Sequence, residues 1–178
     1  KTFSLWFDPG FTPDANGTAV RLFNTVNSGH EIWLNDFNAS ISGEILGIRK
    51  DTGETTYVTA ANANFSDGWN HLAFVWDGGP PRYRVYLNGV EVAVNASAEG
   101  HFPFFGGHAH SYFGATTGAG DVRYAGKIDE FRLYNYSLSA AEILAQYQYP
   151  TSDADADGLT VTQEWNLGTD EDDDDSDD

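Results

Sequence analysis

The sequence predicts an all-β protein built as a sandwich of antiparallel sheets, followed by one short helix and an acidic tail. First, residues 1–136 are a series of short segments in which apolar and polar residues alternate, separated by turn-rich stretches. Second, 15% of the 178 residues are aromatic, enough to fill a core. Third, residues 151–178 hold 12 of the 27 acidic residues and no basic residue. We therefore expect two units, residues 1–149 and residues 150–178.

The strands follow one another with turn signals about every ten residues. In "TFSLWFD", Phe3, Leu5 and Phe7 share one face. In "WNHLAFVWD", Leu72 and Phe74 do the same. The remaining predicted strands are "TAVRLFNT", "HEIWLN", "ASISGEILGIRK", "ETTYVTA", "RYRVYLNGVEVAV", "SYFGA", "DVRYAG" and "KIDEFRLYNY".

Two local signals fix particular elements. Asn88-Gly89 stands between two alternating runs, which predicts a type I′ hairpin. In "SLSAAEILAQY", Ser139 and Glu142 form a capping box, so a helix begins there. Pro150 should end that helix. Its apolar residues Leu138, Ile143, Leu144 and Tyr147 are expected to face the sandwich.

The acidic tail contains the run "DADADGLTVTQE", residues 153–164. It fits the twelve-residue calcium-loop pattern D-x-D-x-D-G-x₅-E. Calcium takes six to eight oxygen ligands, and this pattern supplies them. Gly158 permits the sharp turn, and Val161 contributes only through a bridging water. A disordered acidic tail is the alternative. The expected ligands are the carboxylates of Asp153, Asp155 and Asp157, the Leu159 carbonyl and a bidentate Glu164.

This loop does not have the setting of an EF-hand, because Pro150 leaves no helix of useful length before it. Residues 153–170, "DADADGLTVTQEWNLGTD", instead resemble a thrombospondin type 3 repeat. The resemblance implies a calcium-stiffened spacer, and Asp175 and Asp177 would begin a second repeat. Glu171 replaces the proline usual after "GTD", which puts the register of that repeat in doubt.

The body resembles the laminin G-like, concanavalin A-like superfamily in "DGWNHLAFVWDG", "RYRVYLNGVEV" and "AGKIDEFRLYNYSLSAAEILAQY". The resemblance implies a jelly-roll sandwich and does not settle function, since that fold hosts lectins, hydrolases and spacers. It also implies a structural calcium ion held by Asp129, with a surface ion pair as the alternative. Relatives begin with one more strand, so we expect an upstream segment or a second subunit to supply it at an open sheet edge.

Enzymatic activity is not expected. Glycoside hydrolases of this fold need two carboxylates about 5–10 Å apart on one face, and no strand carries acidic residues at alternate positions in that way. No nucleophile-elbow motif is present either. A sugar site is the alternative, because aromatic faces and His or Asn donors suit a glycan. The candidates for it are Trp33, His110 and Tyr112.

The net charge of −18 argues against nucleic acid and anionic lipid as partners, and no run of apolar residues is long enough to insert in a membrane. The chain lacks cysteine, so no disulfide holds it. Five N-x-S/T sequons suggest a glycosylated, exported protein. They lie at Asn16, Asn38, Asn64, Asn95 and Asn135.

Together these features predict a non-catalytic extracellular module, stabilised by calcium, for adhesion or cell-surface architecture. One alternative is a carbohydrate-binding (lectin) module of a larger secreted enzyme. Another is the subunit of a surface filament or sheath that assembles by strand donation through an open sheet edge. A glycan or an extracellular protein is the expected partner. Aromatic residues ringing a concave face would favour the lectin.

Overall fold

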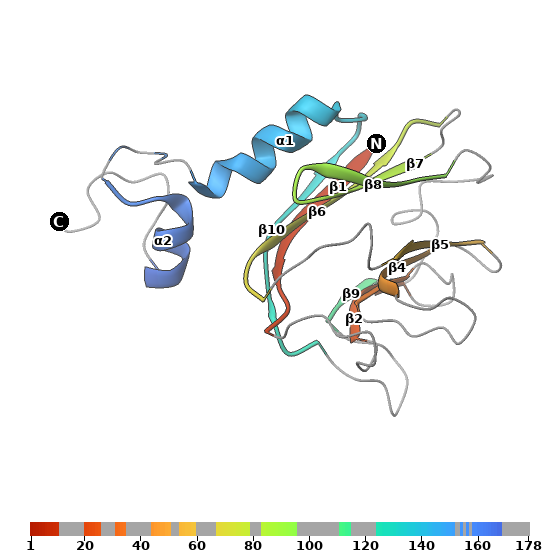
Figure 1. Cartoon of the computed structure of the whole chain (residues 1–178), viewed down its shortest axis with the longest axis horizontal. Helices are drawn as coiled ribbons and strands as arrows, with labels where there is room; N and C mark the ends of the chain where they lie inside the picture. Colours follow the sequence, from red (N-terminus) through yellow and green to blue (C-terminus); the bar gives the residue numbers. More distant parts are fainter. Residues whose placement is uncertain are drawn as a thin grey trace.

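The computed structural model describes residues 1–10, 20–25, 31–34, 44–50, 54–59, 67–78, 83–95, 111–114, 124–151, 154, 156 and 158–168. Two five-stranded antiparallel sheets face each other in these residues (Figure 1). The first sheet has the order β10-β1-β6-β7-β8 and the second has the order β5-β4-β3-β2-β9. The antiparallel β-sandwich predicted from the sequence is thus confirmed. The bounds of the elements are β1 Thr2–Asp8, β2 Val20–Thr25, β3 Glu31–Leu34, β4 Glu44–Lys50, β5 Glu54–Thr59, β6 Asn70–Trp76, β7 Tyr83–Leu87, β8 Val90–Asn95, β9 Ser111–Phe113, β10 Lys127–Tyr134, α1 Ala140–Gln148, η1 (a 3₁₀ turn) Tyr149–Thr151 and α2 Val161–Leu167.

The sandwich core lies between the two sheets and is made by the alternating apolar residues of each strand. The ring of Phe3 is central: its centroid lies 6.3 Å from that of Phe74 in the same sheet and 6.3 Å from that of Phe23 in the other. These contacts join the sheets through side chains that water cannot reach. The buried members are Phe3, Leu5, Phe7, Leu22, Phe23, Ile32, Leu72, Phe74, Val85 and Leu87.

Helix α1 covers the outer face of the first sheet, on the side away from the second sheet (Figure 1). The residues that alternate with the core residues of β6, Ala73 and Val75, pack there against Leu138 and Ile143. The capping box predicted at the helix start is present, since the Ser139 hydroxyl accepts a hydrogen bond from the Glu142 N–H. Strands β1 and β6 of the first sheet are therefore buried on both of their faces, whereas β10 at the edge alternates between exposed and half-buried residues.

The hairpin between β7 and β8 is the one predicted. Asn88 and Gly89 both have positive φ angles, 52° and 76°, as a type I′ turn requires. The Asn88 side chain also ties the turn to the start of β6, because its Oδ1 accepts a 2.9 Å hydrogen bond from the His71 N–H. Its Nδ2 donates to Asn70 Oδ1.

One expectation needs correction. Tyr124 to Gly126, the described part of "DVRYAG", do not form a strand. The Tyr124 hydroxyl lies within hydrogen-bond distance of the carbonyls of Asp8 (2.6 Å) and Lys127 (2.9 Å), so this segment crosses the end of β1 as a connection. Leu144 is 41% exposed, but its Cδ1 lies beside Gly89 in the β7–β8 turn, so it faces the sandwich as predicted.

Strand β1 is paired on both sides, with β10 and with β6. The end strands of its sheet are β10 and β8, within the part of the chain that the structure describes. A donated strand therefore cannot pair next to β1. The expected supply of a further strand concerns some other edge and stays a prediction.

Candidate functional site

The outer face of the second sheet carries a row of residues that four strands place in register. Arg21 of β2 pairs with Trp33 of β3, which pairs with Gly47 of β4, which pairs with Tyr57 of β5. Because Ile32 lies in the core, Trp33 and its register partners lie on the opposite face. Two aromatic residues and an arginine thus share one row, and the glycine leaves the point between the aromatic positions without a side chain.

A second polar row lies beside the first on the same face. Tyr112 of β9 pairs with Asn24, Asn24 pairs with Glu31, and Glu31 pairs with Arg49. Tyr112 is half-buried. Carboxylate, amide and guanidinium groups together offer both acceptors and donors. The two rows combine aromatic positions with groups that hydrogen-bond hydroxyls, which is the chemistry a sugar requires.

The structure brings together two of the three sugar-site candidates that the sequence predicts. Trp33 and Tyr112 lie on the same face of the second sheet, separated by β2. His110 lies outside the described residues. Sequence reasoning missed Arg21, Gly47 and Tyr57. Alternation in "ETTYVTA" places Tyr57 on one face of its strand, but only the register across β4 and β5 shows that this is the face of Trp33.

The predicted calcium loop begins just after η1 and ends within the first turn of α2. Asp153, Asp155 and Asp157 lie outside the described residues, while Gly158 has a φ of 97°, the conformation that the sixth loop position requires. Helix α1 ends at Gln148, before Pro150, as predicted. A single 3₁₀ turn, η1, follows it to Thr151 and includes Pro150, whose missing N–H costs no hydrogen bond in the first turn of such a segment.

The second half of the loop forms the start of α2, a helix that the sequence analysis did not predict. Thr160 is its N-cap, with a capping box to Gln163, and Gly168 ends it with a left-handed φ of 79°. Glu164 lies in its first turn and is fully buried, as is Val161. The signal was present in "TVTQE", since T-x-x-Q is a capping-box pattern. Within the described residues, no three His, Asp or Glu side chains gather as a metal cluster.

Asp129 lies on β10 and is exposed. Its Oδ1 accepts a 2.7 Å hydrogen bond from the N–H of Glu130, where β10 bulges opposite β1. Glu130 has a φ of 49° and forms an ion pair with Arg132. The alternative of a surface ion pair thus holds for Glu130, and a calcium ion at Asp129 stays a prediction.

The predicted glycosylation sites also differ in where they lie. Asn135 is exposed just after β10, and Asn95 is the last residue of β8. Asn16, Asn38 and Asn64 lie outside the described residues, as do Asp175 and Asp177 of the expected second repeat.

His71 is a buried histidine on the outer face of β6, under the C-terminal half of α1. The centroid of its ring lies 5.1 Å from that of Trp6. Burial lowers the pKa of its imidazole from 6.5 to about 4, against a weaker opposite effect of the Gln146 side chain. The ring is therefore neutral at physiological pH and packs as part of the structure.

The family model described as the concanavalin A-like lectin/glucanases superfamily, of the laminin G type, matches residues 1–144. The chain belongs to this superfamily. The matched range ends inside α1, and a search of curated sequences finds no significant match.

Solved structures with similar folds include domains of glycan-acting enzymes. Domain 4 of AbnA, an extracellular arabinanase from Geobacillus stearothermophilus solved with arabinotriose, is 25% identical with a TM-score of 0.58. The match covers 83% of this chain and 66% of that domain. The CBM40 domain of the Ruminococcus gnavus IT-sialidase, bound to α2,3-sialyllactose, is 20% identical with a TM-score of 0.55. That match covers 82% of this chain and 81% of the CBM40 chain. The NanB sialidase of Streptococcus pneumoniae is 24% identical with a TM-score of 0.59, and the match covers 81% of this chain and 23% of the sialidase. The chain thus spans less than two thirds of the arabinanase domain and about a quarter of the sialidase. Among the described residues, no helix is long and apolar enough to cross a membrane.

Proposed function

We propose that the chain is a non-catalytic carbohydrate-binding module of an extracellular protein. The observation that carries this proposal is the row Arg21–Trp33–Gly47–Tyr57 on the outer face of the second sheet. An aromatic ring presents an apolar face to the C–H side of a sugar, and neighbouring polar groups hydrogen-bond the hydroxyls. Helix α1 covers the outer face of the first sheet, and among the described residues no helix covers the outer face of the second sheet (Figure 1).

The neighbouring structures support this proposal. The arabinanase domain was solved with arabinotriose and the CBM40 domain with sialyllactose. An adhesion module and a strand-donated filament subunit remain the alternatives, and each predicts no defined sugar ligand.

The test is a glycan array followed by calorimetry with the ligands found, with arabinotriose and α2,3-sialyllactose included. Trp33→Ala should weaken binding by tenfold or more, about 1.4 kcal/mol, as for an aromatic residue central to an interface. Tyr136→Ala is the matched control, because Tyr136 is an exposed aromatic residue that follows β10 of the first sheet. No binding to any glycan, or equal loss in both variants, would refute the proposal.

We further propose that residues 153–164 bind calcium. The support is the sequence pattern, the positive φ of Gly158 and the burial of Glu164 in the first turn of α2, the element that closes such loops. Asp153, Asp155, Asp157 and Glu164 would supply carboxylate oxygens, and Leu159 its carbonyl. A bound ion would supply the positive charge that holds these carboxylates together, because four of them repel one another otherwise.

Calorimetric titration of calcium into the full chain tests this second proposal. Glu164→Gln should weaken calcium binding at least tenfold, since an amide cannot act as a bidentate anion. Glu91→Gln, an exposed carboxylate on β8, is the control that should leave it unchanged. Equal affinities in the wild-type chain and Glu164→Gln would contradict the loop assignment.

A further inference from the structure

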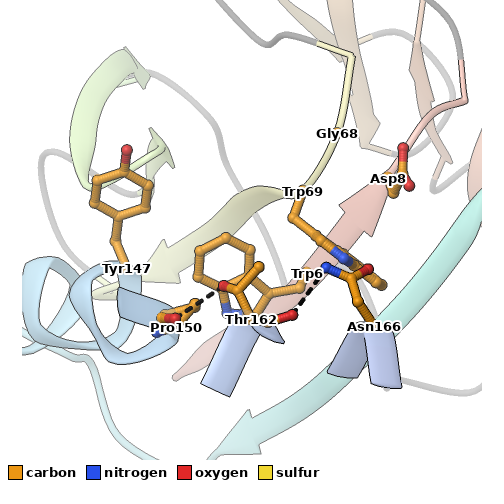
Figure 2. A pocket seen from close by; sticks show the side chains of 8 residues that line it. All are labelled: Trp6, Asp8, Gly68, Trp69, Tyr147, Pro150, Thr162 and Asn166. Atoms are coloured by element: carbon orange, nitrogen blue, oxygen red, sulfur yellow. Dashed lines mark hydrogen bonds between the residues drawn. The ribbon is translucent and has the colours of Figure 1, made fainter. Parts of the chain in front are cut away.

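A pocket of about 490 Å³ lies between the first sheet and the C-terminal helices (Figure 2). These helices lie on the side of the first sheet away from the second sheet (Figure 1). One wall comes from β1 and the segment before β6, and the other from α1, η1 and α2. The volume is in the range of pockets that hold small ligands, about 300–1,000 Å³.

Three aromatic residues line this pocket. The rings of Trp6 and Tyr147 stack on each other with centroids 6.0 Å apart and planes 15° apart, and both residues line the floor of the pocket. Trp6 is 5% exposed and is fixed by the sheet. Trp69 stands at the side and is partly exposed (Figure 2). The Nζ of Lys127 lies 5.8 Å from the centroid of its ring.

Polar groups lie at the rim. Asp8 is half-buried, and its Oδ2 lies 3.5 Å from Lys127 Nζ, which offsets its charge. From α2, Thr162 and Asn166 face the pocket one helical turn apart. The Thr162 hydroxyl donates to the Pro150 carbonyl at 2.8 Å, and the Asn166 Nδ2 donates to the Thr162 carbonyl at 2.9 Å. The Asn166 amide oxygen makes no hydrogen bond within the described part of the chain.

We propose that this pocket is a second carbohydrate site, which takes one uncharged sugar residue. An aromatic floor with a carboxylate and an amide at the rim suits a ring that has an apolar face and hydroxyl edges. The opposite charges of Asp8 and Lys127 balance locally, so the pocket attracts neither anionic nor cationic ligands strongly. The net charge of −18 disfavours an acidic sugar.

This inference rests on the proposed carbohydrate-binding function but concerns a different surface. Two sites on opposite sides of the sandwich would let one module engage two glycan chains. Once one site has bound a glycan surface, the second site meets its sugar at a raised effective concentration. The overall avidity then exceeds the affinity of either site alone without any new contact. The pocket also joins the segments on either side of the predicted calcium loop, because Tyr147 precedes the loop and Asn166 follows it.

Fluorine NMR on the full chain labelled with 5-fluorotryptophan, in calcium buffer, distinguishes the two sites. The chain has five tryptophans, and single Trp→Phe variants assign their signals. The probes are the methyl glycosides of galactose, N-acetylglucosamine and arabinose, added to about 10 mM, ten times a millimolar dissociation constant. Trp6 and Trp69 report on the pocket and Trp33 on the outer face of the second sheet.

We expect at least one probe to shift the Trp6 and Trp69 signals in a saturable manner. Asn166→Phe, which places a ring in the pocket from α2, should remove these shifts. Leu167→Phe changes the neighbouring exposed residue, which does not line the pocket, and should leave them unchanged.

A shift of Trp33 alone would overturn the pocket and leave the proposed function standing. Saturable shifts of the Trp6 and Trp69 signals with an unchanged Trp33 signal would support the pocket site and count against a site on the outer face of the second sheet. Shifts of Trp6 and Trp69 that persist in Asn166→Phe would also overturn the pocket, since binding would then occur elsewhere. Static signals at all three positions would overturn both proposals for these sugars.

Discussion

Acidification should destabilise this fold through His71. The side chain is 1% exposed and lies between Trp6 and α1, where burial lowers its pKa from 6.5 to about 4. In the unfolded chain the imidazole keeps its ordinary pKa. As the pH falls below 6.5, the imidazole is therefore protonated in the unfolded state, whereas in the folded state it is protonated only near pH 4. The stability that His71 contributes is complete above pH 6.5 and is lost as the pH falls towards 4.

The size of the loss follows from the two pKa values. They differ by roughly 2.5, and each pKa unit corresponds to about 1.36 kcal/mol, which gives about 3 kcal/mol between pH 6.5 and pH 4. This is a large part of the stability of an ordinary domain, about 5–15 kcal/mol. The many carboxylates of the chain also titrate in this range, so the wild-type curve alone does not isolate His71.

The assay is urea unfolding at several pH values for the wild-type chain and His71→Gln, a neutral side chain at every pH. The free energy of unfolding of the wild type, minus that of the variant, should fall by about 3 kcal/mol from pH 7 to pH 4. Parallel curves would refute the argument. The imidazole proton of His71 in the wild-type NMR spectrum gives an independent check, and a titration near pH 6.5 would refute it equally.

Three further changes have outcomes that the structure sets, each measured by urea unfolding at pH 7. Ser139→Ala should cost about 1 kcal/mol, because it removes the N-cap of α1; Ala141→Ser, inside the same helix, is the control and should cost less. Gly89→Ala should cost about 1–2 kcal/mol, since its φ is 76° and the new Cβ would lie 2.9 Å from Leu144 Cδ1; a neutral result would mean that the turn is not type I′. Gly126→Ala should cost about 2 kcal/mol, because the Cβ would overlap the Asp8 carbonyl oxygen; an unchanged midpoint would contradict the crossing of β1 by this segment.

The parts of the fold that the sequence predicts well are those written in local patterns. Alternation identifies Phe3, Leu5 and Phe7 as a core face, and all three are buried. Asn88-Gly89 fixes a hairpin because few residues other than glycine and asparagine adopt positive φ angles. Ser139 and Glu142 fix a helix start, because their hydrogen bonds span only three residues.

The parts that the sequence did not reveal depend on register or on contacts between distant segments. Nothing in "TFSLWFD" shows that Trp6 stacks on Tyr147, 141 positions along the chain. The row of Arg21, Trp33 and Tyr57 likewise needs three strand pairings before it exists. A bulge adds to this difficulty, since Leu22 and Phe23 are neighbours and are both buried, which strict alternation does not allow.

The two sheets have different roles because of what covers them. Val75 and Tyr86 on the outer face of the first sheet are buried by Leu138 and Ile143, so that face holds the C-terminal helices in place. Ligand access on that side is left to the end of the face, where the helices meet Trp69 and Asp8 and leave a pocket. The second sheet carries its aromatic and polar rows across four strands. For the proposed carbohydrate-binding function, a chain-like glycan would suit the outer face of the second sheet, and a single sugar residue would suit the pocket.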